Sequence, residues 1–232
     1  MFTCLALWIG VQVRGHAAIA STPSSITASA QSAEPPAIAQ STPSAPATRN
    51  QTAPLDFQGR MLVSISDADM VASAYVDRQL GPREGEDALS ILPLGGDYRR
   101  MQAIELAGVT NSVAGPPSAV TVSPDGRWTF VVESFRPATP SMQLFTDLER
   151  GNRLTAIDLS NPRQPRIHQQ LEVGTRPETV EISPQGDMLL VTLHPADGRQ
   201  LAFVPWNEGE FGTPIYTTLP DVAGDVRVSH AV

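Results

Sequence analysis

Two stretches of the chain match each other sixty residues apart: PSAVTVSPDG at residues 117–126 and PETVEISPQG at residues 177–186. Proline, valine, serine, proline and glycine recur at the same places in both. Each stretch alternates apolar and polar residues, which is the period of a β-strand, and then reaches a Pro-x-Gly turn. The match therefore predicts a strand-and-turn unit that is built twice.

Further strands are predicted after each turn. WTFVVE at residues 128–133 and MLLVTL at residues 188–193 are nearly continuous apolar runs, typical of strands covered on both faces. The third and fourth strands are predicted at residues 154–159, 166–173, 201–206 and 214–219. Four short strands per repeat, with no helical periodicity between them, form the unit of a β-propeller blade.

A weaker copy precedes these two repeats. Its strands are predicted at residues 62–66, 70–76, 88–94 and 101–106, and Asp67-Ala68-Asp69 stands where the later copies carry Pro-x-Gly. The predicted fold class is all-β: a β-propeller with about three four-stranded blades at residues 58–115, 116–174 and 175–227. Residues 228–232 would start a fourth blade, so the ring would be incomplete in this chain. A two-sheet sandwich is the alternative, but it does not account for the repeated turn.

The repeat carries a family resemblance. The block at residues 117–127, followed by an apolar strand, resembles the YVTN-type repeat of lactonase-like propellers and of many exported repeat proteins. AIDLSNPRQP at residues 156–165 is similar to the strand and turn of LVIVD-type repeats. The resemblance covers about residues 58–232 and implies the propeller fold. It implies no particular activity, because the matching residues are turn formers and strand cores.

The resemblance also bears on catalysis. A lactonase-like propeller would carry His-Pro at the opening of an innermost strand and Asn-Tyr at the end of a second strand. This chain has different pairs at those places: Pro116-Pro117, Arg176-Pro177, Glu133-Ser134 and His194-Pro195. The departure argues against hydrolase activity.

The N-terminal region predicts export. CLALWIGVQV at residues 4–13 has the length of a signal-peptide core, and Ala18-Ile19-Ala20 fits a cleavage site. A disordered apolar N-terminus is the alternative. Residues 21–54 are mostly Ser, Thr, Pro and Ala, a composition typical of a flexible linker. We therefore expect a signal peptide at 1–20, a linker at 21–54, a partial propeller at 55–232, and a periplasmic or extracellular location. The apolar run is too short to span a membrane.

Composition excludes several classes of site. The net charge is −8, and all 16 cationic residues are arginine, so Schiff-base and P-loop lysines are absent. The acidic balance argues against a nucleic-acid partner, which requires a basic surface. Cys4 is the single cysteine, and the histidines beyond residue 20 lack metal-binding spacing. We expect neither a cofactor nor a metal.

Candidate site residues come from the propeller geometry. Ligands of propellers gather near the channel, where the second strands end and the innermost strands begin. Asp77, Glu133 and His194 are predicted at the ends of second strands, and Ser118, Glu178 and His230 near the starts of innermost strands. Glu133 and His194 are the catalytic candidates, because a carboxylate and an imidazole can activate water. Asp77, Glu178 and His230 are the ligand-binding candidates. Polar residues at wet strand ends can equally have no function.

Two function classes remain open. The first is an exported, non-catalytic propeller that binds an unknown protein or small molecule on one face. The alternative is a lactonase-like hydrolase with a site near Glu133 and His194. The long connection at residues 135–152 is either a lid or partner-binding loop, or an insertion packed on its own blade. Residues 81–87 (GPREGED) are interpreted as a solvated charged turn, and Trp128 and Trp206 as core residues.

Overall fold

The structure is a computed structural model. It describes residues 59–71, 73–83, 85–94, 101–109, 118–194, 198–207, 209–220 and 228, all of which belong to one compact unit of the chain. The predicted signal peptide, the predicted linker, His230 and all of the predicted fourth-blade strand except Val228 lie outside the described residues. Within the described ranges, no helix is long and apolar enough to cross a membrane.

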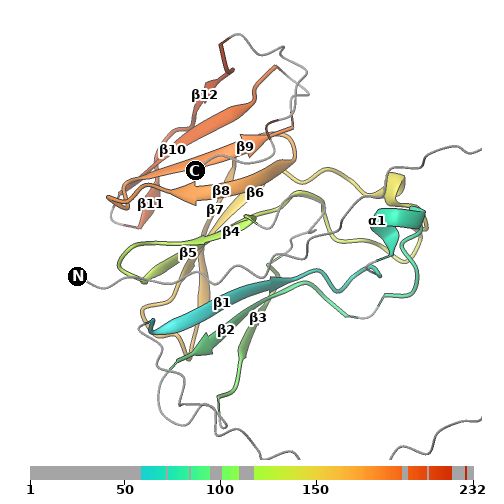
Figure 1. Ribbon diagram of the computed structural model, residues 1–232, viewed down its shortest axis with the longest axis horizontal. Coiled ribbons are helices and arrows are strands. Elements are labelled where there is room, and N and C mark those ends of the chain that lie inside the picture. The colour runs from blue at the N-terminus through green and yellow to red at the C-terminus, as the bar shows by residue number, and fades with distance from the viewer. Residues whose placement is uncertain are drawn as a thin grey trace, which may run out of the picture. The chain divides into compact units, whose positions relative to one another are not determined.

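The described chain is all-β, as predicted, with antiparallel sheets and little helix (Figure 1). The middle sheet has the predicted four strands in the order β4-β5-β6-β7. They are β4 (Val120–Val122), β5 (Trp128–Val132), β6 (Arg153–Asp158) and β7 (Arg166–Glu172). Strands that follow each other in the sequence are neighbours in the sheet, as in an antiparallel meander.

The last sheet contains one strand more than predicted. Its strands are β8 (Pro177–Ile182), β9 (Met188–Leu193), β10 (Leu201–Asn207), β11 (Glu210–Phe211) and β12 (Ile215–Thr217). Both β11 and β12 pair with β10: Phe211 lies opposite Trp206, and Thr217 lies opposite Leu201. The short β11, which the sequence analysis did not predict, therefore extends the coverage of β10 toward its C-terminal end.

The first sheet corrects the predicted register. It contains three strands within the described residues: β1 (Met61–Ser66), β2 (Ala88–Pro93) and β3 (Ile104–Ala107). The strand predicted at residues 70–76 is wrong, because helix α1 (Ala74–Asp77) lies there and β1 pairs directly with β2. A short apolar run fits either a strand or a helical turn, and its tertiary packing decided the outcome.

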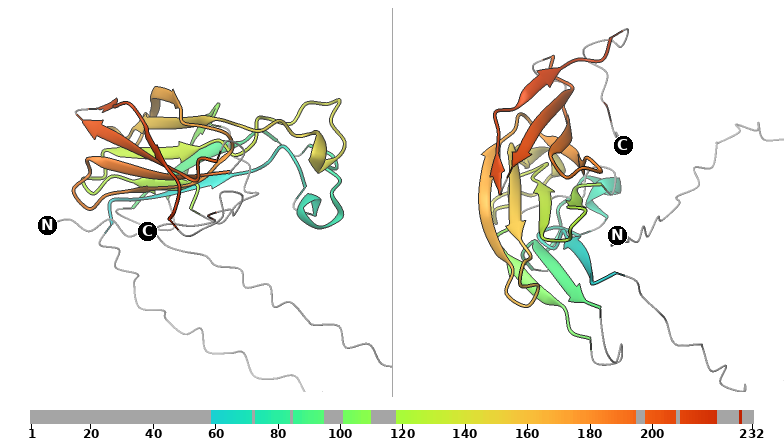
Figure 2. Two further views of the ribbon diagram at one scale, coloured as in Figure 1. Left: turned by 90° about the horizontal axis from the view of Figure 1, so that it is seen from above. Right: turned by 90° about the vertical axis from the view of Figure 1, so that its left-hand side faces the viewer.

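Strand β1 corresponds to the second strand of the later repeats. It pairs with the strand that follows a long connection, as β5 pairs with β6. The two long connections, residues 67–87 and 133–152, extend together beyond the same end of the sheets (Figure 2). They also touch, because the Ala138 N–H donates to Asp69 Oδ2. The first repeat is therefore displaced by one strand from its predicted alignment.

The core between the second and third sheets is aromatic. The Phe130 and Trp206 rings meet edge to face with centroids 4.8 Å apart, and Trp128 meets Trp206 at 5.2 Å. Trp128 and Trp206 are both buried, which confirms their interpretation as core residues. Edge-to-face pairs of this kind add to the stabilisation that burial alone provides.

The matched apolar positions of the repeat are buried to different extents. Val131, Val180 and Val191 are fully buried, as predicted. The prediction was too strong for Val120 and Val122 on the edge strand β4 and for Ile182 at the end of the edge strand β8, all of which are only half-buried. A second core, which includes Leu89, Ile91 and Ile157, joins the first sheet to the middle one.

The two long connections form a small apolar cluster of their own, which we call the satellite cluster. Its buried members are Met70, Ala74, Leu80, Phe135, Ala138 and Leu148. The backbone joins them as well, because the Leu80 N–H donates to the Gln143 carbonyl at 2.9 Å. The connection at residues 135–152 thus packs on the neighbouring repeat, which neither interpretation of it had anticipated.

The turn that follows β6 is stabilised by the carboxylate of Asp158. Asp158, at the end of β6, is 7% exposed, and its carboxylate accepts the Ser160 N–H at 2.8 Å and the Arg166 guanidinium at 3.1 Å. Burial raises the pKa of Asp158, but the hydrogen bonds from Ser160 and Arg166 outweigh it and lower this pKa to about 2.

Candidate functional site

Two of the three residues predicted at the ends of second strands lie there in the structure, and the third does not. Glu133 directly follows β5 and His194 directly follows β9, as predicted. Asp77 does not end a strand: it lies exposed in α1, where its Oδ1 accepts the Gln79 N–H at 2.9 Å. Because the first repeat is displaced by one strand, Asp67 takes the equivalent position directly after β1.

Glu133 is held in a buried ion pair. Its side chain is 3% exposed, and Arg153 donates to both carboxylate oxygens, with Nε 3.1 Å from Oε2. The Asn152 N–H donates to Oε2 at 3.4 Å. The hydrogen bond with Glu133 raises the pKa of Arg153. A two-point pair of this kind orients both side chains, so Glu133 serves here as an anchor for the start of β6.

The backbone around Glu133 leaves no room for a larger residue at Gly151. A Cβ atom at Gly151 would lie 2.2 Å from the Glu133 carbonyl oxygen. The carbonyl of Gly151 in turn accepts the Arg176 N–H at 2.8 Å. Glycine at this position therefore allows the two ends of the β5–β6 connection to approach each other closely.

Glu178 is also paired with an arginine. Its side chain is fully buried, and Oε1 lies 3.5 Å from the Nε of Arg176. The Arg176 guanidinium lies over the Phe135 ring at 4.5 Å, a cation–π distance, and its backbone adopts the left-handed φ of 47°. The backbone N–H of His194 donates to the carbonyls of Thr175 and Arg176.

Three predicted site residues are thus linked through the same loops. Glu133, Glu178 and His194 are connected by Gly151 and Arg176, and the Ser134 Oγ donates to the Pro177 carbonyl at 2.7 Å. Ser118 lies farther along the junction of the sheets, where its carbonyl accepts the Val180 N–H. Both carboxylates of this group face guanidinium groups. The arrangement joins two sheets more readily than it presents a base to a substrate.

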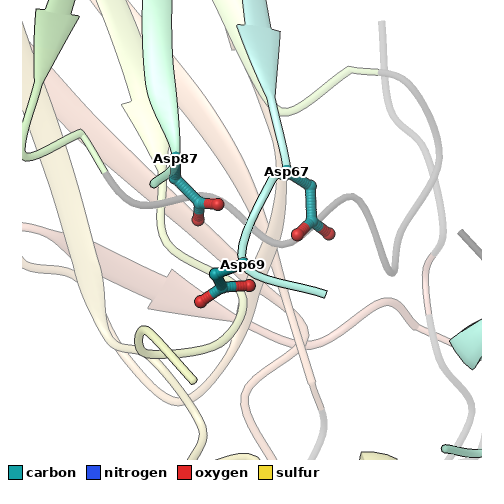
Figure 3. Close-up of side chains that lie close together, drawn as sticks. All are labelled: Asp67, Asp69 and Asp87. Atoms are coloured by element: carbon teal, nitrogen blue, oxygen red, sulfur yellow. The ribbon is translucent and has the colours of Figure 1, made fainter. Parts of the chain in front are cut away.

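A second polar group was missed from the sequence. Asp67, Asp69 and Asp87 each offer a carboxylate oxygen, and these oxygens lie within 4.8 Å of one another (Figure 3). We call this group the aspartate triad. The Ala68 N–H donates to Asp87 Oδ1 at 3.1 Å, and the Tyr75 hydroxyl donates to Asp67 Oδ2 at 2.5 Å. Burial and the hydrogen bond to Asp67 raise the pKa of Tyr75 well above its usual range.

The signal for the triad was present in the sequence. Asp67 and Asp69 are one residue apart directly after β1, and Asp87 directly precedes β2. Adjacent antiparallel strands bring these positions together. The prediction missed the group because it took Asp67-Ala68-Asp69 for a turn and residues 81–87 for a solvated loop. In fact Asp69 and Asp87 are buried.

A cleft of about 510 Å³ lies between the Pro-x-Gly turns of the second and third sheets. The turns that define the repeat form its walls, with Gly126 at φ 68° and Gly186 at φ 78°, conformations that favour glycine. Its polar lining includes Asp125, Arg127, Gln185, Asp187 and Asn207, and Trp128 and Trp206 also line it.

The charged side chains of the cleft already form hydrogen bonds within the surrounding turns. Asp125 Oδ1 accepts the Ser123 hydroxyl and the Arg127 N–H, and Asp187 Oδ1 accepts the Ser183 hydroxyl at 2.7 Å. The Arg127 Nε donates to Ser160 Oγ at 3.0 Å, and its guanidinium lies 5.1 Å from the centroid of the Trp128 ring. Among the residues that the structure describes, two carboxylates therefore line the cleft against one guanidinium that is already engaged.

No protein-family model matches the chain, and no curated protein is significantly similar to it in sequence. Three solved structures are similar over part of their length. A "putative 6-phosphogluconolactonase" from Bacteroides fragilis has a TM-score of 0.39 and 12% identity, covering 56% of this chain and 33% of that one. A functionally unknown protein from Desulfotomaculum acetoxidans has a TM-score of 0.36 and 14% identity, and the match covers 57% of this chain and 36% of that one. A hypothetical selenium-binding protein from Sulfolobus tokodaii has a TM-score of 0.35 and 12% identity, and the match covers 56% of this chain and 35% of that one. The matched region spans about a third of each of these proteins, and similarity at this level assigns no family and no activity to the chain.

Proposed function

We propose that the chain is a β-propeller-type repeat protein that binds a small polar molecule in the cleft between the Pro-x-Gly turns. The cleft itself carries this proposal: its volume of about 510 Å³ lies within the ~300–1,000 Å³ typical of small-molecule sites. Consecutive antiparallel sheets that pack through two apolar cores support the propeller-type fold. The role is the ligand-binding scaffold predicted from the sequence, but the proposed site lies at the Pro-x-Gly turns and not at the strand ends where the sequence placed it.

The lining favours a neutral or cationic ligand. Asp125 and Asp187 offer carboxylate acceptors, and Gln185 and Asn207 offer amides that can both donate and accept. An anionic ligand would meet two carboxylates against one guanidinium. A compound rich in hydroxyl groups, or one that carries an amine, would donate hydrogen bonds to these acceptors and place its carbon atoms against the indoles.

Export is part of the same proposal. Residues 1–20 would direct the chain out of the cytoplasm, and residues 21–54 would act as a flexible tether. The apolar run and the Ser/Thr/Pro/Ala-rich composition support this proposal. A fractionation experiment with the complete gene product tests it, since export requires the mature protein to lack residues 1–20 and to leave the cytoplasm.

The alternative is a lactonase-like hydrolase that uses Glu133 and His194. The Glu133–Arg153 and Glu178–Arg176 pairs disfavour it, because each carboxylate faces a guanidinium instead of an open surface. A lactone panel, assayed with and without a chelator, separates the two functions. Turnover that Glu133→Gln abolishes would establish the hydrolase and refute the scaffold.

Tryptophan fluorescence tests ligand binding directly. Two of the three tryptophans, Trp128 and Trp206, line the cleft, so a bound ligand should change their emission. The panel comprises neutral sugars, polyols, linear amines and sugar phosphates. We expect saturable binding by neutral or cationic members and none by the phosphates.

Variants locate the binding in the cleft. Gln185→Ala and Asn207→Ala each remove a polar group from the lining, and each should raise Kd about tenfold, since a hydrogen bond contributes about 1–1.5 kcal/mol. Gln164→Ala is the matched control on an exposed turn outside the cleft, and it should leave Kd unchanged. Equal effects of all three variants, or tight binding of sugar phosphates, would overturn the proposal.

A further inference from the structure

We propose that Asp67, Asp69 and Asp87 bind a divalent cation, and that this cation is Ca²⁺. The site lies where β1 ends and β2 begins, apart from the cleft and from the Glu133–Arg153 pair. The inference does not depend on the proposed function. It rests on the donor chemistry, the spacing of the oxygens and the state of one buried carboxylate.

The donors and their spacing fit calcium. Carboxylate oxygens are the ligands that Ca²⁺ and Mg²⁺ prefer. The three oxygens lie within 4.8 Å of one another. Around Ca²⁺, with bonds of ~2.3–2.6 Å, two oxygens on opposite sides are ~4.6–5.2 Å apart. Around Mg²⁺, with bonds of ~2.0–2.1 Å, the same separation is only ~4.0–4.2 Å. Ca²⁺ can therefore bind a pair of these oxygens at any separation up to this limit, whereas Mg²⁺ needs a separation of no more than ~4.2 Å.

Asp69 supplies a second observation that points to a ligand. It is 4% exposed, and its Oδ2 accepts the Ala138 N–H. Its Oδ1 is inaccessible to solvent and accepts no hydrogen bond within the part of the chain that the structure describes. Leaving a buried carboxylate oxygen without a partner is costly, and native structures rarely tolerate it. Figure 3 shows the carboxylates of Asp67, Asp69 and Asp87 gathered around one small space, with Asp69 below the other two.

The surrounding hydrogen bonds hold the carboxylates in place for an ion. Backbone N–H groups of Ala68 and Ala138 bind one oxygen of Asp87 and one of Asp69, and the Tyr75 hydroxyl binds one of Asp67. Groups that orient the ligands of a metal are a common feature of protein sites. A cation would offset the repulsion among three carboxylates and would tie residues 67–87 to the connection at residues 135–152.

Tyr75 provides a spectroscopic reporter for the site. Its hydroxyl lies 2.5 Å from Asp67 Oδ2, close enough for the excited ring to transfer energy to a bound Tb³⁺ ion, which substitutes for Ca²⁺. The full chain, freed of metal by a chelator, is titrated with Tb³⁺. We expect sensitised emission that saturates at one ion per chain. Tyr75→Phe should reduce the emission severalfold, while calorimetry shows that Ca²⁺ still binds at one ion per chain, with an affinity lowered by less than the loss of emission.

Competition and variants decide the assignment. Ca²⁺ should displace Tb³⁺ at a concentration at least tenfold lower than Mg²⁺. Asp69→Asn and Asp87→Asn should each weaken Ca²⁺ binding at least tenfold. Asp77→Asn is the matched control, because it removes the same charge from an exposed site in α1 and should leave the affinity unchanged. Saturating Ca²⁺ at about 100 times Kd should raise Tm by roughly 5–10 °C in the parent chain and not in Asp69→Asn.

Several results would overturn the inference. The first is an absence of saturable Ca²⁺ or Tb³⁺ binding to the parent chain. The second is Tb³⁺ emission that Tyr75→Phe leaves unchanged. The third is a loss of Ca²⁺ affinity in Asp77→Asn as large as that in Asp69→Asn. Preference for Mg²⁺ would refute calcium as the occupant. The parent chain and Tyr75→Phe keep the inference testable if an aspartate variant fails to fold.

Discussion

The repeat places serine at matching positions, Ser123 and Ser183, but the structure buries the two residues unequally. Ser123 is 3% exposed, and its Oγ accepts the Trp128 N–H at 2.9 Å. Ser183 is half-buried, and its Oγ accepts the N–H groups of Asp187 and Met188 at 3.2 Å. Replacing each serine with alanine removes the same oxygen from the equivalent turn, and Ser183 accepts one N–H more than Ser123, so a larger loss at Ser123 would reflect its burial.

The two substitutions should differ in cost. In Ser123→Ala the Trp128 N–H loses its side-chain acceptor at a buried position, which costs about 1–3 kcal/mol. In Ser183→Ala water can reach the turn, so the loss should be about 0.5–1 kcal/mol. At ~2–4 °C per kcal/mol for a chain of this size, the expected decrease in Tm is roughly 2–12 °C for Ser123→Ala and 1–4 °C for Ser183→Ala.

Thermal and urea unfolding of the full chain, followed by circular dichroism, provide the assay. The urea midpoint should move while the slope of the transition stays the same, because a polar deletion in a turn leaves the exposed area unchanged. Ser141→Ala is the control at an exposed serine. Equal losses for Ser123→Ala and Ser183→Ala, or a larger loss for Ser183→Ala, would refute the argument from burial.

Further substitutions test other parts of the fold. Gly151→Ala places a Cβ against the Glu133 carbonyl and should destabilise the chain by about 1–3 kcal/mol, measured by urea unfolding; an unchanged midpoint would contradict the close approach. The pKa of Asp158 is about 2 in the folded chain and ~3.9 in the unfolded chain. Ionised Asp158 therefore adds about 2 kcal/mol to the free energy of unfolding above pH 4, and this stabilisation is lost as the pH falls toward 2. Asp158→Asn should therefore flatten the acid side of the stability profile, and an unaltered profile would count against it. Val191→Ala, in the core, should lower the free energy of unfolding by about 2–3 kcal/mol, and Val122→Ala, on an edge strand, by about 1 kcal/mol. The reverse order in calorimetry would show that Val191 is not the more deeply buried of the two.

The strands of the second and third repeats could be predicted from the sequence because local signals coincide there. The Pro-x-Gly turns end one strand and begin the next, and the apolar runs after them have no helical period. Strand β11 escaped detection because Glu210 and Phe211 alone carry no pattern. In the first repeat the Pro-x-Gly turn is missing, and the long β1–β2 connection hides which strands pair.

The sequence predicted where Glu133 and His194 lie but not what they contact, and it did not predict the cleft. The ends of β5 and β9 located Glu133 and His194 correctly, since strand ends follow from the turns. The pairing of Glu133 with Arg153 could not be predicted, because it depends on how the long connection closes. The triad was missed for the same reason: Asp67 and Asp87 are twenty residues apart in the sequence and become neighbours only when β1 pairs with β2.

The satellite cluster has a consequence for how the chain acquires its structure during synthesis. Half of its buried residues lie before β2 and half after β5, so Met70 leaves the ribosome 78 residues ahead of Leu148. At ~5–20 residues per second, Met70 waits roughly 4–16 s for Leu148 to be synthesised. The first sheet therefore emerges with its long connection unprotected, and the second repeat acts as the partner that completes it. A nascent-chain protease assay would detect this as cleavage near residues 70–80 that ends once translation has passed Leu148.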